Sequence, residues 1–155
     1  MREINQIVIV DDNKIDCFIN QKVCSNTYNN ACVKTFNCSV MALDYFKETS
    51  KVYKISPMNK SSVVLILLDI NMPSINGFEL LNELEKMNYF SNKEVEVYFL
   101  SSSNNESDIS KALKAEFCSG YIIKPLTKEK LMSVMATENE EEYMQNNFIS
   151  IKRDF

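Results

Sequence analysis

Short runs of hydrophobic residues recur along this chain, and each run is followed by a segment whose apolar residues are spaced as on one face of a helix. The third run, residues 63–68, is apolar at every position. Such continuity is typical of a central parallel strand that is covered on both faces. The pattern predicts strands over residues 7–10, 32–36, 63–68, 95–100 and 121–123.

Apolar residues at intervals of three or four predict a helix after each strand. The first helix carries Ile15, Phe18 and Ile19, and a capping-box pattern over residues 103–106 precedes the fourth. Strands that alternate with helices favour a doubly wound α/β fold, in which five parallel strands form one sheet with helices on both faces. The predicted helical segments are 15–23, 40–49, 78–87, 109–113 and 131–135.

Two segments lack these patterns. Residues 50–62 are predicted to form a long, mobile connection, and residues 138–155 a polar tail that begins with several glutamates. A charge run of this kind usually forms a solvated helix end. With 155 residues in total, we expect one domain over residues 1–137 and a tail too short for a DNA-binding or enzymatic output domain.

The composition indicates which binding partners and which cellular compartment to expect. The chain has 17 basic and 21 acidic residues, and a net acidic surface argues against nonspecific binding to nucleic acids or anionic membranes. The sequence has no apolar run long enough to span a membrane, and because its first residues lack the charged-then-apolar layout of a secretion signal, we expect none. Its five cysteines form no CxxC pair, so we expect reduced packing residues in a cytoplasmic protein.

Two scarce residue types exclude several kinds of chemistry. The chain contains no histidine, which excludes Ser-His-Asp and Cys-His catalysis, histidine-ligated zinc and a phosphohistidine on this chain. It has only two glycines, too few for a glycine-rich phosphate-binding loop.

Charged and hydroxyl side chains stand where four of the predicted strands end. Asp11 and Asp12 follow the first strand. Asp69 follows the third strand, Ser101 the fourth and Lys124 the fifth. In a doubly wound sheet, ligands bind at the carboxyl ends of the strands, near the switch point in strand order. Each piece alone is ordinary turn or capping chemistry, but together they predict a site.

The charges of these residues indicate the chemistry of the site. Three carboxylates close together repel one another, and a hard divalent cation such as Mg²⁺, which prefers oxygen ligands, would relieve that repulsion. Asp69 ends the most buried strand and is the best candidate for a nucleophile toward phosphorus. Asp11 and Asp12 would hold the metal. Lys124 would neutralise phosphoryl oxygens, and Ser101 would donate a hydrogen bond to one of them.

Longer stretches around these residues form a recognisable set, which resembles the receiver domains of two-component response regulators over about residues 5–137. The resemblance implies a flavodoxin-like (βα)5 receiver fold of the small, stand-alone type. The stretches are Ile9-Val10-Asp11-Asp12, Leu67-Leu68-Asp69-Ile70-Asn71-Met72-Pro73, Asn76-Gly77-Phe78-Glu79-Leu80, Phe99-Leu100-Ser101-Ser102-Ser103 and Gly120-Tyr121-Ile122-Ile123-Lys124-Pro125-Leu126.

The resemblance gives each acidic residue a role. It implies that Asp69 is the phosphoacceptor and that Asp12 and Asp69 bind Mg²⁺ through their carboxylates. Asn71 would bind the metal through its backbone carbonyl, and Asp11 mainly through a metal-bound water.

The same resemblance implies a conformational switch. Lys124 would contact the phosphoryl group, aimed by a cis peptide bond before Pro125. Ser101, where threonine is commoner, would be the switch hydroxyl. Tyr121 would be the switch aromatic and would turn inward when Ser101 moves toward the phosphate. The alternative for Tyr121 is a partly buried strand residue with no switching role.

The implied function is that of a single-domain response regulator. It would accept a phosphoryl group from a histidine kinase or phosphotransfer protein and catalyse only its own phosphorylation and dephosphorylation. Phosphorylation would control binding to an unidentified downstream protein. The expected contact surface is the face of the fourth helix, fifth strand and fifth helix, around residues 109–131, which would also serve a homodimer.

Three alternatives stay open at this point. A phosphorylation-independent interaction module would have the same fold, although such modules usually lose one of the acidic or lysine positions. A metal-dependent phosphatase with an aspartyl nucleophile would need a second aspartate two residues later, where this chain has Asn71. A flavin-binding protein of similar topology would need hydroxyls and amides, not carboxylates, after the first strand.

Overall fold

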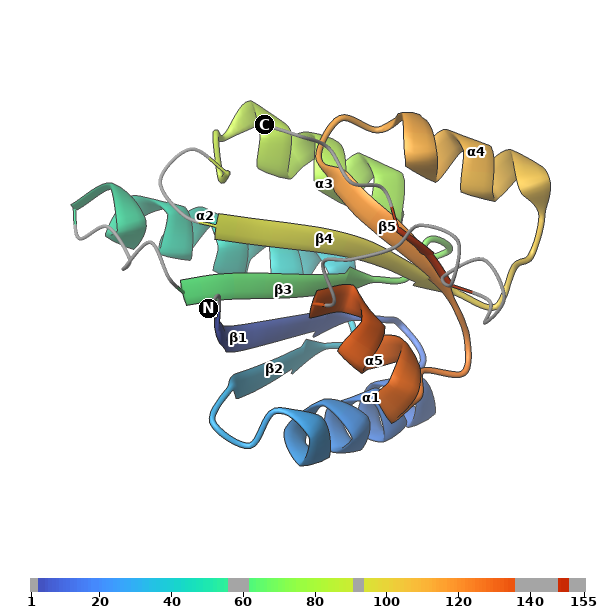
Figure 1. Cartoon of the computed structure of the whole chain (residues 1–155). Coiled ribbons are helices and arrows are strands. Elements are labelled where there is room, and N and C mark those ends of the chain that lie inside the picture. The colour runs from blue at the N-terminus through green and yellow to red at the C-terminus, as the bar shows by residue number, and fades with distance from the viewer. Residues whose placement is uncertain (1–2, 56–61, 91–93, 136–147, 151–155) are drawn as a thin grey trace.

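One twisted sheet lies between two layers of helices, with α1 and α5 on one face and α2, α3 and α4 on the other (Figure 1). The computed structural model describes residues 3–55, 62–90, 94–135 and 148–150. The elements, in chain order, are β1 (Glu3–Val10), α1 (Lys14–Thr27), β2 (Cys32–Phe36), α2 (Ser39–Ile55), β3 (Ser62–Leu68), α3 (Gly77–Lys86), β4 (Glu94–Ser101), α4 (Glu106–Lys114), β5 (Cys118–Ile123), α5 (Lys128–Met135) and β6 (Phe148–Ser150).

The first five strands are parallel and lie in the order β2-β1-β3-β4-β5, which confirms the predicted doubly wound fold. Strand β2 lies on one side of β1, whereas β3, β4 and β5 follow on the other side. The order of the strands therefore switches between β1 and β3. In such sheets the carboxyl ends of the strands beside the switch point form the ligand-binding region.

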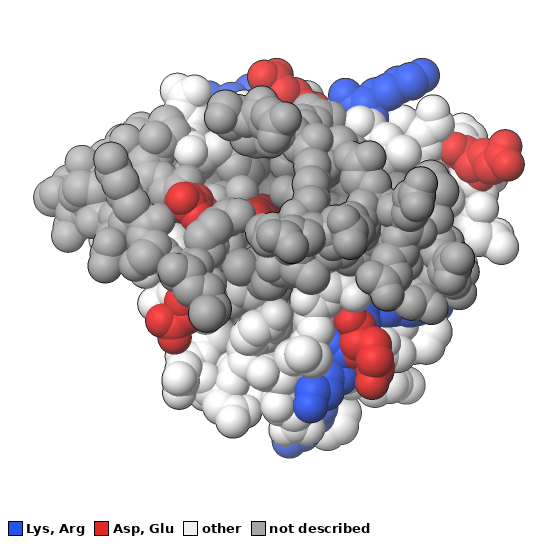
Figure 2. Space-filling model, in the orientation of Figure 1, with Lys and Arg blue, Asp and Glu red and all other residues white. Residues whose placement is uncertain are grey.

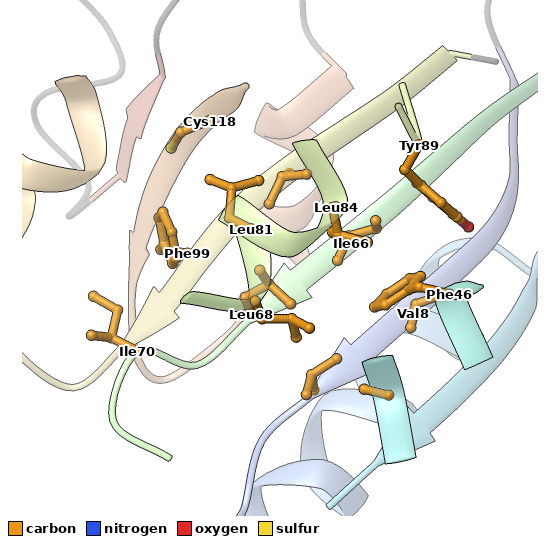
Figure 3. Packing of buried hydrophobic residues seen from close by; sticks show 14 of the residues in the cluster. Val8, Phe46, Ile66, Leu68, Ile70, Leu81, Leu84, Tyr89, Phe99 and Cys118 are labelled. Atoms are coloured by element: carbon orange, nitrogen blue, oxygen red, sulfur yellow. The ribbon is translucent and has the colours of Figure 1, made fainter. Parts of the chain in front are cut away.

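Burial on both faces explains why β3 is apolar over residues 63–68. All of its residues are buried. They alternate between two hydrophobic clusters: Ile66 belongs to the cluster under α2, α3 and α4, and Leu67 to the cluster under α1 and α5. Figure 3 shows the first cluster, in which Phe46 of α2 and Leu84 of α3 face the strands. The two clusters fix β3 at the centre of the fold, and with it the position of the residue that follows.

A sixth strand, β6, was not predicted. It pairs antiparallel with β5 and places Ile149 opposite Tyr121. The tail has only two consecutive apolar residues here, so its hydrophobic pattern gave no strand signal. Pairing satisfies the backbone groups on the outer edge of β5, which an unpaired strand would leave open. The other residues of the predicted tail, 138–147 and 151–155, lie outside the described residues.

Two local predictions were wrong. Helix α2 continues to Ile55, so the predicted connection at residues 50–62 begins too early, and residues 56–61 lie outside the described residues. The cap of α4 is Asn105, whose side-chain oxygen accepts a hydrogen bond from the Ser107 N–H (2.8 Å). The hydroxyl of Ser103, predicted as the cap, instead accepts from the Asn105 N–H (3.1 Å) in the preceding turn.

The surface and the cysteines agree with the composition. On the face shown in Figure 2, the described lysines are interspersed with acidic residues and form no continuous basic patch there. Within the described ranges, no helix combines the length and the apolar character needed to cross a bilayer.

All five cysteines are free, and Cys17, Cys24 and Cys118 are buried as packing residues.

Candidate functional site

The four predicted strand ends meet at one edge of the sheet. Backbone hydrogen bonds extend the strand pairing into the loops. The Asp69 N–H donates to the Val10 carbonyl (2.8 Å), and the Lys124 N–H donates to the Ser101 carbonyl (2.8 Å). These bonds fix the backbone of Asp69 and Lys124 at the edge of the sheet, and so the positions from which their side chains extend.

Asp11, Asp12 and Asp69 form an acidic cluster. One carboxylate oxygen from each residue lies within 4.8 Å of the others. Asp11 and Asp69 are buried, whereas Asp12 is exposed. Burial raises the pKa of Asp69 to about 6; the negative charge of Asp11 adds to this rise, and the positive charge of Lys124 opposes it. The folded protein therefore holds the Asp69 carboxylate in an unfavourable environment when no cation is bound.

The donor set of this cluster fits a hard divalent cation. Three carboxylates from two strand ends offer the oxygen ligands that Mg²⁺ prefers, and a cation among them would offset the repulsion felt by Asp69. Asn71 lies two residues beyond Asp69 in the loop after β3. Its role as a backbone ligand stays a prediction.

Lys124 supplies the positive charge of the site. Its ammonium group donates to Asp11 Oδ2 (2.7 Å) and Asp16 Oδ2 (2.9 Å), and lies 3.6 Å from Asp69 Oδ1. Burial alone would lower the pKa of Lys124, but the hydrogen bonds to Asp11 and Asp16 raise it above its ordinary value. Lys124 therefore stays charged. The peptide bond before Pro125 is cis, as the resemblance implied.

Asp16 is a member of this site that sequence reasoning missed. It lies in the first turn of α1, and its backbone N–H donates to the side chain of Asn13 (3.1 Å), which caps the helix. One signal was available. A helix that begins just after Asp12 completes its first turn near Asp16, which can bring that side chain back toward the strand ends.

Ser101 and Tyr121 are linked through Ser103. The Ser101 hydroxyl is buried and accepts a hydrogen bond from the Ser103 N–H (3.2 Å). The Tyr121 hydroxyl donates to the Ser103 carbonyl (2.8 Å). Tyr121 is fully buried in the cluster that includes Ala112 of α4, and this burial raises the pKa of its hydroxyl. The Tyr121 ring thus points inward in this structure, and its switching role stays a prediction.

The loop after β3 returns to the sheet through a close contact at Gly77. The side chain of Asn76 and that of Glu79 form a reciprocal capping box at the start of α3. The Gly77 N–H donates to the Ile70 carbonyl (2.8 Å). A Cβ on Gly77 would overlap the backbone oxygen of Asp69. Only glycine allows α3 to begin this close to the phosphoacceptor candidate.

The fold and these side chains match one family of known proteins. The family model described as the response regulator receiver domain matches residues 7–136. The chain therefore belongs to the response regulator receiver family, whose members work in two-component signalling.

Individual relatives agree with this assignment. The chain is 28% identical over 126 residues to the two-component response regulator ORR1 of Oryza sativa subsp. japonica, covering 81% of this chain and 51% of that protein. It thus spans about half the length of the rice protein. It is 32% identical over 126 residues to the two-component response regulator ARR17 of Arabidopsis thaliana, covering 81% of this chain and 79% of that protein.

Solved structures show the same fold. The crystal structure of a two component response regulator from Cytophaga hutchinsonii superposes with a TM-score of 0.71 at 27% identity, covering 86% of this chain and 95% of that chain.

Proposed function

We propose that this protein is a signalling phosphoacceptor that receives a phosphoryl group on Asp69 from the histidine of a kinase or phosphotransfer protein. The observation that carries this proposal is the position of Asp69, which follows the central strand and lies beside both the acidic pair Asp11 and Asp12 and the ammonium group of Lys124. These 155 residues contain no histidine, so the donor histidine would lie outside them. The protein would act in the cytoplasm and turn over no substrate besides its own phosphoryl group.

The transfer itself requires little from the protein beyond positioning and charge. A carboxylate oxygen of Asp69 attacks phosphorus, a new P–O bond forms, and the bond from phosphorus to the donor nitrogen breaks with its electron pair remaining on the imidazole. Lys124 neutralises the incoming phosphoryl oxygens. Hydrolysis later restores the Asp69 carboxylate and releases inorganic phosphate.

A bound Mg²⁺ would offset the negative charge that builds up between the phosphoryl group and the carboxylates. Asp12 and Asp69 would hold it through their carboxylates, Asn71 through its carbonyl and Asp11 mainly through water.

The phosphorylated state would then change the protein surface. Ser101 would turn its hydroxyl from the Ser103 N–H toward the phosphoryl group. Tyr121 is tied to the same Ser103 and would adjust with it. The downstream partner would recognise this change on the face of α4, β5 and α5. Because β6 pairs with the outer edge of β5, a homodimer through this face would contact the helices and β6 rather than that edge.

The test of the proposal is covalent labelling. Incubation with acetyl phosphate and Mg²⁺, followed by intact mass measurement, should show one added phosphoryl group on the wild type and none on Asp69→Asn. Omitting Mg²⁺ should suppress the addition. The proposal would be refuted if the wild type were labelled neither by small-molecule donors nor by histidine-bound donors. The control is Asp44→Asn, which removes an exposed carboxylate on α2 and should be labelled like the wild type.

Helix α1 presents an apolar surface beside the acidic cluster. The predicted stripe does lie on this helix, but it faces solvent: Ile15 is 70% exposed and Phe18 is 59% exposed. The buried face of α1 carries Cys17, Asn20 and Cys24 instead. Because α1 starts directly after the acidic pair, a helix that carries the donor histidine could rest on this surface while the histidine reaches Asp69.

Phe18→Ser is therefore expected to slow phosphoryl transfer from a histidine-phosphorylated protein by about tenfold, the effect of losing part of one buried aromatic contact. Labelling by acetyl phosphate, which needs no docking surface, should be unchanged. Val52→Ser is the control, because Val52 is an exposed apolar residue on α2. Equal slowing with both donors would mean that Phe18 acts on the site and not on docking.

A further inference from the structure

Three carboxylates surround the single ammonium group of Lys124. Asp11 and Asp16 accept its hydrogen bonds at 2.7 Å and 2.9 Å, whereas Asp69 Oδ1 is 3.6 Å away, beyond a normal hydrogen-bond distance. An ammonium group has three donors. Two of them are directed at residues other than the phosphoacceptor in this state.

Asp16 differs from the other two carboxylates. It lies outside the acidic cluster and comes from the first turn of α1, where the helix N-terminus favours a negative charge. Its side chain is 35% exposed, compared with 2% for Asp11. Water can therefore solvate the carboxylate of Asp16 if Lys124 leaves. Asp11 would stay buried, with the Asn13 N–H donating to Oδ1 (2.9 Å) but with its Oδ2 deprived of the ammonium donor.

We propose that Asp16 is a positioning residue that holds Lys124 in the unphosphorylated protein and gives it up to the phosphoryl group. The inference rests on the proposed function, because it concerns the same phosphoacceptor site. Anionic oxygens bound to Asp69 compete with Asp16 for the ammonium group, and Asp16 is the partner that is exchanged at least cost.

This exchange would link the phosphoryl group to α1. In this structure, the contact between Asp16 and Lys124 joins the first turn of α1 to the loop after β5. Its loss would leave that turn, which includes the exposed Ile15, held by the helix cap and by backbone bonds. The surface proposed to receive the donor would thus change after transfer.

The competition gives a measurable expectation. Asp16→Asn keeps the size of the side chain but replaces a charged acceptor with a neutral one. It should tighten the binding of beryllium fluoride in the presence of Mg²⁺ by about threefold, the range of a partly exposed ion pair, as measured by titration calorimetry. Asp16→Glu restores the charge and should return the affinity close to the wild-type value.

A double-mutant cycle separates this exchange from a general loss of negative charge. In a Lys124→Met background, Asp16→Asn should no longer alter the affinity, because no ammonium group is left to release. Asp44→Asn removes an exposed charge on α2 and should leave the affinity unchanged.

The inference would be overturned if Asp16→Asn tightened the binding of beryllium fluoride equally in both backgrounds. It would also be overturned if Asp16→Asn alone bound beryllium fluoride as the wild type does, or more weakly. If Lys124→Met does not fold, the comparison of Asp16→Asn with Asp16→Glu decides alone: equal affinities would refute the exchange.

Failure of the proposed function would give a different result. In that case the wild type would bind no beryllium fluoride and would not be labelled by acetyl phosphate. If the wild type binds and is labelled normally, a negative result with the Asp16 variants concerns only the role of Asp16.

Discussion

Replacing Gly77 with alanine should lower the free energy of unfolding by about 3 kcal/mol and slow the phosphorylation of Asp69. An added Cβ would overlap the backbone oxygen of Asp69 and lie 3.1 Å from the Cα of Ile70. Both neighbours are backbone atoms, which cannot rotate aside as the end of a side chain can. The overlap is relieved only if α3 or the segment that carries Asp69 moves. The substitution should therefore disturb the site as well as the fold.

Chemical denaturation and the rate of labelling by acetyl phosphate measure the two effects of Gly77→Ala. Ser107→Ala is a suitable control, because Ser107 is exposed in the first turn of α4 and the change there tests helix propensity alone. In a helix, alanine is favoured over glycine by about 1 kcal/mol, so helix propensity alone would make Gly77→Ala more stable than the wild type. A Gly77→Ala variant that is as stable as the wild type and is labelled at the same rate would contradict the prediction.

Much of the site could be predicted because it depends on strand ends. β3 is buried along its whole length because it lies between the two helical layers. That position also places Asp69 at the centre of the sheet edge. Parallel strands bring their carboxyl ends to one edge whatever the loops do. The positions of Asp11 and Lys124 at the site therefore followed from their places in the sequence.

Other features depend on close approach in three dimensions, which spacing does not show. The apolar stripe of α1 predicted a helix but not the face that meets the sheet, and Phe18 lies on the exposed side. Asp16 joins the site only because α1 packs with its first turn beside the loop after β5. Gly77 is required by a contact with the backbone of Asp69, and β6 forms because the edge of β5 is available.

In the metal-free protein, Asp69→Asn should raise the free energy of unfolding at neutral pH by as much as about 3 kcal/mol. The pKa of Asp69 is about 6 in the fold, against an ordinary value of 3.8, because burial and the charge of Asp11 oppose its ionisation. A raised pKa means that the folded state binds this proton more tightly than the unfolded chain does. The stability linked to Asp69 is therefore fully present below 3.8 and is lost as the pH rises through about 6.

Asparagine is neutral at every pH, so the stability difference between Asp69→Asn and the wild type should be small in acid and complete above neutrality. Urea denaturation with a metal chelator, from about pH 4 to about pH 8, measures this difference across the range in which it develops. Asp44→Asn, which removes an exposed carboxylate on α2, should follow the wild type. Added Mg²⁺ should stabilise the wild type more than Asp69→Asn, because only the wild type offers the third carboxylate to the metal. A gain that is equal at both ends of the pH range would instead assign the effect to packing around residue 69.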